Sequence, residues 1–303
     1  MIDFNLILTF LEVARLENLH VAAQKLHVTP SALSQRIKLL EDQIGKSLFL
    51  RKRSGMEINR HGKKLRELCV NLELERERIE NWMMSEKDYI GGRLRIATIP
   101  GISSYVFPNF METFLNQYPD ITTTISANIS AGVEEWVLSG KADLGIIAGN
   151  CQKPSLKTQR LFVNNPIIMV CSPDYFLAKR KRITKKDLSE AEMIWHVDKP
   201  SRTLREISRK LGISPHTGKG SLNLPSMDAA KQHALKGLGV ACVAKLYVNE
   251  ELKNRTLIAL PNFMIKIALH LISRNEKYES PAVKIFKKKF VEYCHKLDKE
   301  WKD

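Results

Sequence analysis

The stretch that decides the fold is residues 21–53, VAAQKLHVTPSALSQRIKLLEDQIGKSLFLRKR. Two adjacent alanines and Leu26 form the narrow apolar stripe of a short helix, which Asn18 can cap. Such small side chains let another helix approach closely. Thr29 can cap the next helix, and Pro30 suits its first turn, where a missing N–H costs nothing. The pattern predicts two helices joined by a tight corner.

The helix after this corner has two chemically different sides. Its apolar residues recur at spacings of four, three and four, so they share one side that faces inward. These residues are Leu33, Ile37, Leu40 and Ile44. The side chains that lie away from this stripe are Ser31, Ser34, Gln35, Arg36 and Lys38. An anchored apolar side and a free hydrogen-bonding side are what reading base edges in the DNA major groove requires.

A hairpin wing is predicted next, with a strand, a turn and a returning strand at residues 48–50, 54–55 and 56–59. Its cations would neutralise phosphates and fix the register on DNA. They are Arg51, Lys52, Arg53 and Arg60. An ordinary three-helix bundle with a solvated polar face is the alternative interpretation of these residues.

A long charged helix is expected from about residue 61 to residue 88. It carries a sparse apolar seam at steps of three and four residues, formed by Leu65, Leu68, Leu72, Ile79 and Trp82. Such a seam on a polar helix favours pairing with a second copy of the chain. The alternative is an exposed helix that packs only on its own domain.

Residues 10–50 resemble the winged helix-turn-helix of the LysR-type transcriptional regulators. The matching residues are Ala22-Ala23, Leu26-His27-Val28, Ser31-Ala32-Leu33-Ser34, Ile37, Leu40-Glu41, Ile44-Gly45 and Leu48-Phe49. The resemblance implies DNA contacts at Pro30, Ser31, Ser34, Gln35, Arg36, Arg51 and Arg53. It also implies a homodimer through residues 61–88.

Two positions depart from the family pattern. Many members have Ser-Arg-Gln where this chain has Ser34-Gln35-Arg36, so the assignment of single base contacts changes. The usual Thr-x-x-Gly near the end of the wing is here Asn59-Arg60-His61-Gly62. Since Asn59 can also cap a helix, we expect the geometry to be kept.

The bulk composition favours a multidomain protein with a polyanionic partner. The chain has 303 residues, a net charge of +15, 44% hydrophobic and 27% charged residues. DNA and RNA are the usual partners of such a charge. The sequence shows no apolar run of about 18 residues and no signal-peptide pattern, so we expect a cytoplasmic location and no membrane association. Five scattered cysteines without a C-x-x-C pair predict free thiols, no zinc site and no cofactor.

Beyond residue 91 strands and helices alternate, which predicts doubly wound sheets. Expected strands include residues 94–97, 122–127, 144–147, 167–171, 193–197, 240–243 and 265–272. Expected helices include residues 103–118, 132–139, 184–191, 203–211, 227–237 and 281–297. Two such sheets would form two lobes around a cleft, with crossings near residues 164–166 and 261–267.

This part resembles the effector-binding domain of the same family, which is itself similar to periplasmic binding proteins. The matching residues include Tyr118-Pro119, residues 140–146 (GKADLGI) and Gly237-Leu238-Gly239-Val240. The fold class we expect is therefore α/β. It comprises a winged helix-turn-helix (residues 1–60), a linker helix (61–90) and a two-lobed domain with mainly parallel sheets (91–303). Lobe I covers residues 91–164 and 267–303, and lobe II covers residues 165–266.

Ligands of open α/β sheets bind at the carboxyl ends of strands, where helix N-termini present free N–H groups. The resemblance points to the same corners. Candidate effector contacts there are Thr98, Ser103, Ser104, Asn128, Ser130, His196 and Ser226. The alternative for each hydroxyl is a helix cap without a ligand.

The function we expect is a sequence-specific transcriptional regulator. Its partners would be a double-stranded DNA operator, an unknown small-molecule effector, further copies of the chain as dimer or tetramer, and RNA polymerase if it activates transcription. An enzyme is disfavoured, because the strand ends offer chiefly hydroxyls and one histidine and no G-x-S-x-G or metal-binding spacing occurs. A solute-binding protein for uptake is the third candidate, and the absence of a signal peptide disfavours it.

Overall fold

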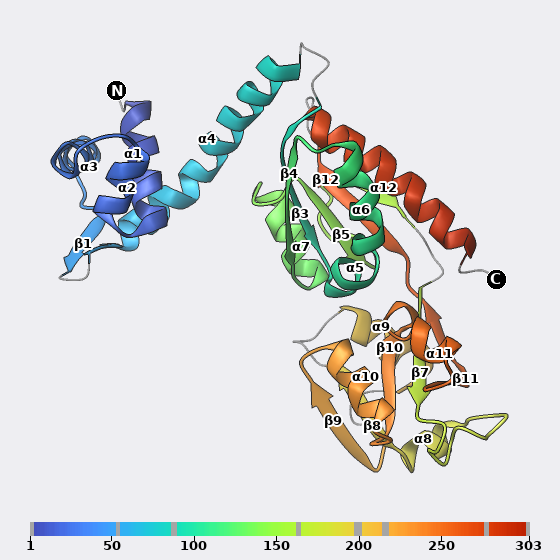
Figure 1. Ribbon diagram of the computed structural model, residues 1–303. Coiled ribbons are helices and arrows are strands. Elements are labelled where there is room, and N and C mark those ends of the chain that lie inside the picture. The colour runs from blue at the N-terminus through green and yellow to red at the C-terminus, as the bar shows by residue number, and fades with distance from the viewer. Residues whose placement is uncertain are drawn as a thin grey trace. The chain divides into compact units, whose positions relative to one another are not determined.

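A computed structural model describes residues 3–52, 55–85, 90–161, 165–196, 202–213, 218–275 and 279–300 (Figure 1). The chain divides into two compact units, Met1–Met83 and Met84–Asp303, and each is described by itself. The predicted wing residue Arg53 lies outside the described residues.

The first unit is a winged helix-turn-helix, as predicted. Its elements are α1 (Phe4–Leu16), α2 (Leu19–Lys25), α3 (Pro30–Ile44), β1 (Phe49–Lys52), β2 (Gly55–Ile58) and α4 (Arg60–Ser85). The helix starts follow from side-chain caps, because Asn18 accepts the backbone N–H of Val21 and Thr29 accepts that of Ala32. Gly45 ends α3 with a φ of 71°, a conformation that glycine adopts without strain.

A small core holds these helices together. The two alanines of α2 are buried, which lets α2 pack closely against α1 and α3. Phe10 of α1 is fully buried, and its ring centroid lies 5.6 Å from that of Phe49 in the wing. The core therefore fixes the wing and the helix-turn-helix as one body.

The second unit contains two five-stranded sheets, and the first of them forms lobe I. Its strand order is β4-β3-β5-β12-β6. The strands are β3 (Gly92–Thr98), β4 (Ile121–Ala127), β5 (Leu144–Ala148), β6 (Leu156–Arg160) and β12 (Leu269–Arg274). The helices are α5 (Pro100–Tyr105), α6 (Phe107–Gln117), α7 (Ser130–Leu138) and α12 (Pro281–Glu300). Helices α6 and α12 cover one face of this sheet and α7 covers the other (Figure 1).

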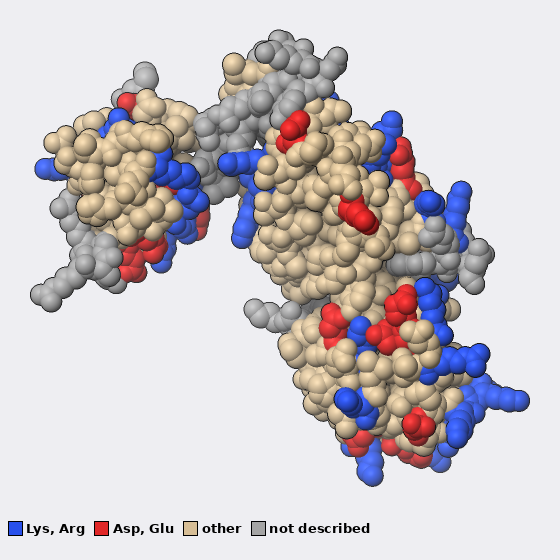
Figure 2. All heavy atoms as spheres, viewed as in Figure 1, with Lys and Arg blue, Asp and Glu red and all other residues tan. Residues whose placement is uncertain are grey.

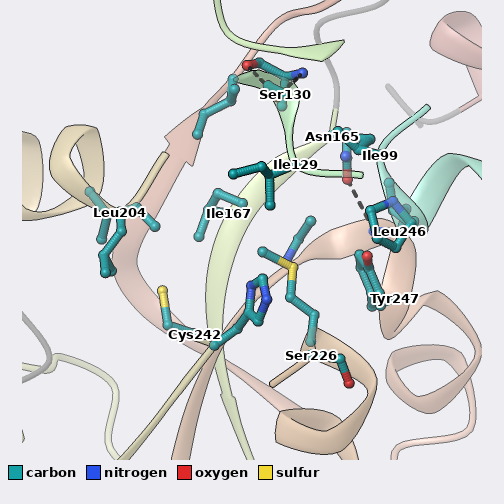
Figure 3. Close-up of a pocket in the computed structure, with 18 of the residues that line it drawn as sticks. Ile99, Ile129, Ser130, Asn165, Ile167, Leu204, Ser226, Cys242, Leu246 and Tyr247 are labelled. Carbon is teal, nitrogen blue, oxygen red and sulfur yellow. Dashed lines mark hydrogen bonds between the residues drawn. The ribbon is translucent and has the colours of Figure 1, made fainter. Parts of the chain in front are cut away.

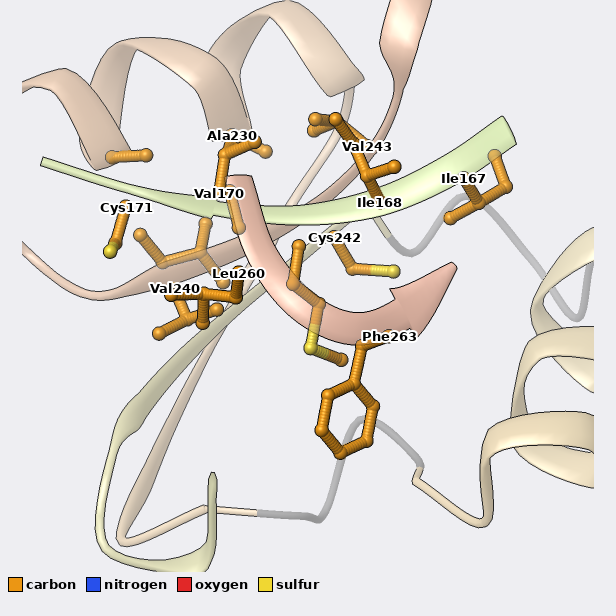
Figure 4. Close-up of a cluster of buried hydrophobic side chains, with 14 of the residues drawn as sticks. Ile167, Ile168, Val170, Cys171, Ala230, Val240, Cys242, Val243, Leu260 and Phe263 are labelled. Atoms are coloured by element: carbon orange, nitrogen blue, oxygen red, sulfur yellow. The ribbon is translucent and has the colours of Figure 1, made fainter. Parts of the chain in front are cut away.

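The second sheet forms lobe II, with strand order β11-β7-β10-β8-β9. Its strands are β7 (Pro166–Cys171), β8 (Glu192–His196), β9 (Gly220–Leu224), β10 (Val240–Ala244) and β11 (Ile258–Lys266). Its helices are α8 (Lys185–Ser189), α9 (Arg202–Leu211), α10 (Met227–Leu235), the 3-10 turn η1 (Lys245–Tyr247) and α11 (Asn249–Lys253). Strands β7 and β10 are buried along their whole length, and their side chains form the centre of this core (Figure 4).

Both sheets are mixed, and in each of them four of the five strands run in the same direction, as expected of mainly parallel sheets. In lobe I, β3 is parallel to β4 and β5, whereas β12 is antiparallel to β5 and β6. In lobe II, β8 is parallel to β9 and β10, whereas β7 is antiparallel to β10 and β11. The chain crosses between the sheets before β7 and again before β12, and each of these strands runs against its neighbours.

Several element boundaries also differ from the sequence prediction. The single helix expected over residues 103–118 is two helices that meet at Val106. Pro108 explains the break, because it cannot donate the helical hydrogen bond to the carbonyl of Ser104. The strand expected over residues 265–272 is likewise two strands, β11 and β12. Strands β6 and β9 have polar, largely exposed sequences and were not predicted.

Exposed cations gather around α8 and the turn before it (Figure 2). They are Lys179, Arg180, Lys181, Arg182, Lys185 and Lys186. Arg180 pairs with Asp187, which also accepts the backbone N–H of Thr184 at 2.7 Å. These contacts show a capped helix start on a solvated surface. Among the described residues, no helix has both the length and the apolar character needed to cross a membrane.

Candidate functional site

Helix α3 divides into a buried side and an exposed side, as its sequence predicts. Leu33, Ile37 and Leu40 are at most 2% exposed. The opposite side, called the α3 face below, consists of Ser31, Ser34, Gln35, Arg36 and Lys38. All five are exposed except Ser34, which is half-buried, as is Pro30 at the helix start.

The α3 face is rich in unoccupied polar groups. Arg36 and Lys38 form no ion pair with any residue that the structure describes. The hydroxyls of Ser31 and Thr29 lie 3.0 Å apart, within hydrogen-bond distance, so Ser31 supports the capping residue Thr29 in the first turn of the helix. The face therefore presents two cations, Arg36 and Lys38, and the amide of Gln35 to solvent, where a binding partner can reach them.

The wing is tied to the end of α3 by hydrogen bonds. The carboxylate of Glu41 accepts the backbone N–H groups of Leu48 at 2.6 Å and Phe49 at 3.3 Å. Asn59 donates to the Ser47 carbonyl at 2.9 Å and accepts the N–H of Gly62 at 3.0 Å. The expected cap by Asn59 is thus confirmed.

The cations of the wing are only partly described. Arg51 and Lys52 lie in β1, opposite Met56 and Gly55 of β2, and their side chains are outside the described part of the structure. Arg53 is outside it altogether. Contact of these three residues with DNA stays a prediction.

The apolar seam of α4 changes along the helix. Leu65 packs against the core of the first unit, and Cys69 is buried there. Leu68, directly before Cys69 in the chain, and the later Leu72 and Ile79 are 62%, 42% and 58% exposed within the chain. The side chain of Trp82 is not described. Leu65 and Cys69 therefore attach α4 to its own unit, and Leu68, Leu72 and Ile79 present an exposed apolar stripe.

The second unit contains a cavity of about 400 Å³ lined by both lobes (Figure 3). Lobe I contributes the loops after β3, β4 and β5, and lobe II contributes the ends of β7, β8 and β10 together with α9 and α10. Ile99, Ile129 and Ile167 project into this space from three different elements (Figure 3). The cavity thus lies where β3, β4, β5, β8 and β10 end and where the antiparallel strands β7 and β12 begin.

Four of the seven predicted effector contacts line the cavity: Asn128, Ser130, His196 and Ser226. The Ser130 hydroxyl accepts the backbone N–H of Ala148 at 3.1 Å, and Ser226 caps α10 by accepting the N–H of Ala229 at 3.1 Å. Asn128 accepts the N–H of Ile129 at 2.8 Å. The side-chain oxygens of Asn128, Ser130 and Ser226 therefore accept hydrogen bonds from the local backbone. The three residues nevertheless line the cavity, where a ligand can contact them.

The other three, Thr98, Ser103 and Ser104, are not among the described residues that line the cavity. Thr98 is fully buried, and its hydroxyl donates to the Ile99 carbonyl at 3.3 Å. Ser103 donates to the Pro100 carbonyl at 2.8 Å. Because Pro100 starts α5 immediately after Ile99, the hydroxyls of Ser103 and Ser104 lie one turn inside the helix and not at its start.

Other polar residues of the cavity were missed. They are Asn165, Trp195, Arg205, Asp228 and Tyr247. No local motif marks them, because each reaches the cavity through the packing of a different element. The thiol of Cys242 also lines the cavity, and burial raises the pKa of this thiol to about 12.

A hydrogen-bonded group joins the lobes beside the cavity, and we call it the interlobe cluster. It consists of Tyr105 on α5 and Asp228, Lys231, Tyr247 and Glu251 in lobe II. The Tyr105 hydroxyl donates to Asp228 and accepts from Lys231 Nζ at 3.1 Å. Lys231 is only 8% exposed and pairs with Glu251 at 3.1 Å. The rings of Tyr105 and Tyr247 lie 5.0 Å apart.

The protonation states in this cluster follow from its contacts. Burial and the Asp228 carboxylate raise the pKa of the Tyr105 phenol. Burial alone would lower the pKa of Lys231, but hydrogen bonds to Tyr105 and Glu251 outweigh it and raise that pKa. The cluster therefore holds a neutral phenol between a carboxylate and a protonated amine.

Comparison with protein families identifies both units. Residues 4–63 match the model described as bacterial regulatory helix-turn-helix protein, lysR family. Residues 87–294 match the LysR substrate binding domain. The RuBisCO operon transcriptional regulator of Allochromatium vinosum is 25% identical over 280 residues, which are 92% of each chain.

Solved structures show the same fold. ArgP from Mycobacterium tuberculosis has a TM-score of 0.70 at 17% identity, over 97% of this chain and 98% of that chain. Full-length LysG from Corynebacterium glutamicum with bound effector Arg has a TM-score of 0.54 at 17% identity, over 97% of this chain and 99% of that chain.

Proposed function

Since the chain belongs to the LysR family of helix-turn-helix regulators, we propose that the α3 face reads an operator while a ligand in the cavity controls the regulator. That it is a DNA-binding transcriptional regulator with an effector-binding domain follows from the family. The observation that carries the proposed mode is the exposed polar side of α3, opposite three fully buried apolar residues.

Each residue of the α3 face has a role that suits its chemistry. Ser34 and Gln35 would donate to and accept from base edges in the major groove. Arg36 would bind a guanine edge or a neighbouring phosphate, and Lys38 a phosphate. Pro30 and Ser31 would approach the backbone at the start of the helix, and Arg51, Lys52 and Arg53 would hold the flanking phosphates.

We infer that the exposed stripe on α4, Leu68, Leu72 and Ile79, pairs with a second copy of the chain. Its spacing of four and seven residues keeps the three side chains on one side of the helix. A two-fold dimer would place two α3 faces on the two halves of an operator. Pairs of dimers would form a tetramer through the second units.

The cavity supplies the control. A ligand changes regulation only if it binds one arrangement of the regulator better than another. Asn128, Ser130, His196 and Ser226 would contribute to its binding site. An activating regulator would also contact RNA polymerase, and a protein that acts on chromosomal DNA works in the cytoplasm. The relatives are named as regulators, and we propose that this chain likewise catalyses no reaction.

A mobility-shift titration of the full chain on DNA from upstream of its own gene tests the α3 face. Arg36→Gln should weaken binding about tenfold, because one charged base or phosphate contact is worth roughly 1–3 kcal/mol. Arg66→Gln is the matched control, since Arg66 is an exposed arginine on α4 and is not part of the α3 face. Wild-type affinity for both Arg36→Gln and Ser34→Ala would refute the assignment.

Sedimentation of the full chain tests the stripe on α4. Leu68→Glu combined with Leu72→Glu should give monomers, because it places charge in an apolar seam. Glu67→Gln, on the same helix and 69% exposed at its side chain, should leave the assembly unchanged. A double variant that stays dimeric would refute pairing through α4.

A further inference from the structure

The two charged side chains that line the cavity differ in their partners. The described lining includes one arginine, Arg205, and one carboxylate, Asp228. Asp228 accepts the Tyr105 hydroxyl and lies 3.9 Å from Lys231 Nζ, so this carboxylate already has partners in the interlobe cluster. Arg205 is exposed and forms no ion pair with any described residue. The charged group of the lining that no described residue pairs is therefore a cation, Arg205.

The hydrogen-bonding groups of the cavity show the same asymmetry. The side-chain oxygen of Asn165 accepts the N–H of Leu246 at 3.1 Å (Figure 3). That of Asn128 accepts the N–H of Ile129 at 2.8 Å, so both oxygens are already engaged, whereas both NH₂ groups have no partner among the described residues. The indole N–H of Trp195 is buried without a hydrogen-bond partner in the described structure. A buried donor without a partner is unfavourable, and an acceptor on a ligand would relieve it. The unoccupied groups are donors.

The rest of the wall is hydrocarbon. Its apolar members include Ile99, Ile129, Ile167, Leu204, Met227 and Ile267. They come from both lobes, so a ligand body between them is enclosed on several sides. Cavities of this size and composition bind small organic molecules through apolar contact and a few polar groups.

Two other ligand classes fit this wall less well. A phosphate dianion would need a second cation or several backbone N–H groups, but Pro100 removes one N–H from the start of α5, and Thr98 and Ser103 donate to carbonyls. A guanidinium or amine would need a free carboxylate, and Asp228 is already occupied. LysG, whose structure contains bound effector Arg, would then differ from this chain in its ligand.

We propose that the effector is a small organic acid with a single carboxylate and a branched or aromatic hydrocarbon body. The carboxylate lies toward Arg205, and the body packs against the isoleucines of both lobes. This ligand class rests on the proposed function, in which the cavity is the effector site.

Calorimetric titration of the full chain tests the ligand class with five probes. Benzoate and 3-methylbutanoate should bind, whereas benzamide, inorganic phosphate and L-arginine should bind at least tenfold more weakly. Arg205→Gln should weaken benzoate binding at least tenfold, about 1.4 kcal/mol. Arg209→Gln is the matched control, because Arg209 lies one turn further along α9, is exposed and does not line the cavity. Its benzoate affinity should equal that of the wild type.

Three results would overturn the proposal: no binding of either monocarboxylate at 10 mM, tighter binding of phosphate or L-arginine, or an unchanged affinity in Arg205→Gln. A mobility-shift assay without added ligand distinguishes failure of the proposed ligand class from failure of the proposed DNA binding. Intact DNA binding with no carboxylate binding rejects only the ligand class. Carboxylate binding without any operator binding rejects the proposed control of DNA and leaves the ligand class standing.

Discussion

The carboxylate of Glu41, near the end of α3, accepts the backbone N–H of Leu48 at 2.6 Å, at the entrance to the wing. A second bond from Phe49 reaches the same oxygen at 3.3 Å. One side chain thus sets the position of β1 relative to the helix that carries the α3 face. The recognition helix and the wing can then act on DNA as one rigid surface.

Glu41→Ala should loosen the wing and weaken DNA binding. Two backbone N–H groups lose a charged acceptor, and a hydrogen bond to a charged group contributes about 1.5–3 kcal/mol. Hydrogen exchange at the amides of Leu48 and Phe49 should accelerate. Operator affinity should fall, although removal of a carboxylate would by itself strengthen binding to the phosphates. Asp42→Ala removes an exposed carboxylate from the next position and is the control. Tighter DNA binding in both variants would show that only charge matters.

Two glycines of the first unit should respond differently to alanine. A Cβ on Gly62 would lie 2.3 Å from the carbonyl oxygen of Leu48 and 2.7 Å from Ile58, so backbone must move. Gly45 has open space around it, but its φ of 71° is strained for alanine by about 1 kcal/mol. Gly62→Ala should therefore destabilise the unit by more than Gly45→Ala, at least about 2 kcal/mol. Hydrogen-exchange rates of the α3 amides in the full chain measure the destabilisation by each variant. An effect of Gly62→Ala that is equal to or smaller than that of Gly45→Ala would contradict the packing at Gly62.

The first unit could be predicted from its sequence because its decisive interactions are local. Thr29, Pro30 and Gly45 act within one turn of their own positions, and the apolar stripe of α3 has a clear helical period. Asn59 also caps the helix that follows it directly. Glu41 was identified only as a family marker, since its bonds to residues seven and eight positions away follow no local rule.

The cavity could be predicted only as a location. Strand ends indicated the corners that hold Asn128, Ser130 and Ser226, because sheet topology follows from the order of elements. Arg205 and Trp195 reach it through α9 and β8, and nothing near them in the sequence indicates a ligand. The interlobe cluster joins residues 123 and 126 positions apart, which only the crossing of the chain between lobes brings together.

The pairing of Glu12 with Arg15 and Lys25 should make the stability of the first unit depend on pH. Burial would raise the pKa of Glu12, but its bonds to Arg15 at 2.6 Å and Lys25 at 2.9 Å outweigh this and hold that pKa below its ordinary value of 4.5. A depressed carboxyl pKa stabilises the fold above the unfolded value, and this contribution is lost as pH falls through the folded value. The relevant window is therefore below about pH 4.5.

Glu12→Gln should accelerate exchange of α1 and α2 amides at pH 7 by a few-fold, since such partly exposed pairs contribute about 0.5–1 kcal/mol. The difference from the wild type should shrink as the pH falls below about 4.5 and through the lowered pKa of Glu12. Glu67→Gln breaks a fully solvated pair with Lys64 and should show no difference at either pH. A difference for Glu12→Gln that persists at low pH would show that the packing of this side chain, not its charge, matters.

The interlobe cluster should couple the two lobes energetically. Tyr105→Phe keeps the ring against Tyr247 but removes the hydroxyl that joins Asp228 to Lys231. Asp228→Asn weakens the same bond from the other side, so the double variant should lose less stability than the sum of the single variants. A coupling of about 0.5–1.5 kcal/mol is expected for one hydrogen bond to a partly exposed carboxylate.

Denaturant unfolding of the full chain, followed through exchange at α5 and α10, measures this coupling. Tyr118→Phe is the control, because the hydroxyl of Tyr118 has no hydrogen-bond partner among the described residues and lies in lobe I alone. It should leave exchange at both helices unchanged. Because Asp228 also lines the cavity, Tyr105→Phe frees a carboxylate there, and binding of benzoate should weaken while that of L-arginine strengthens. Additive single variants, or ligand affinities that do not move, would show that the lobes are held together without this cluster.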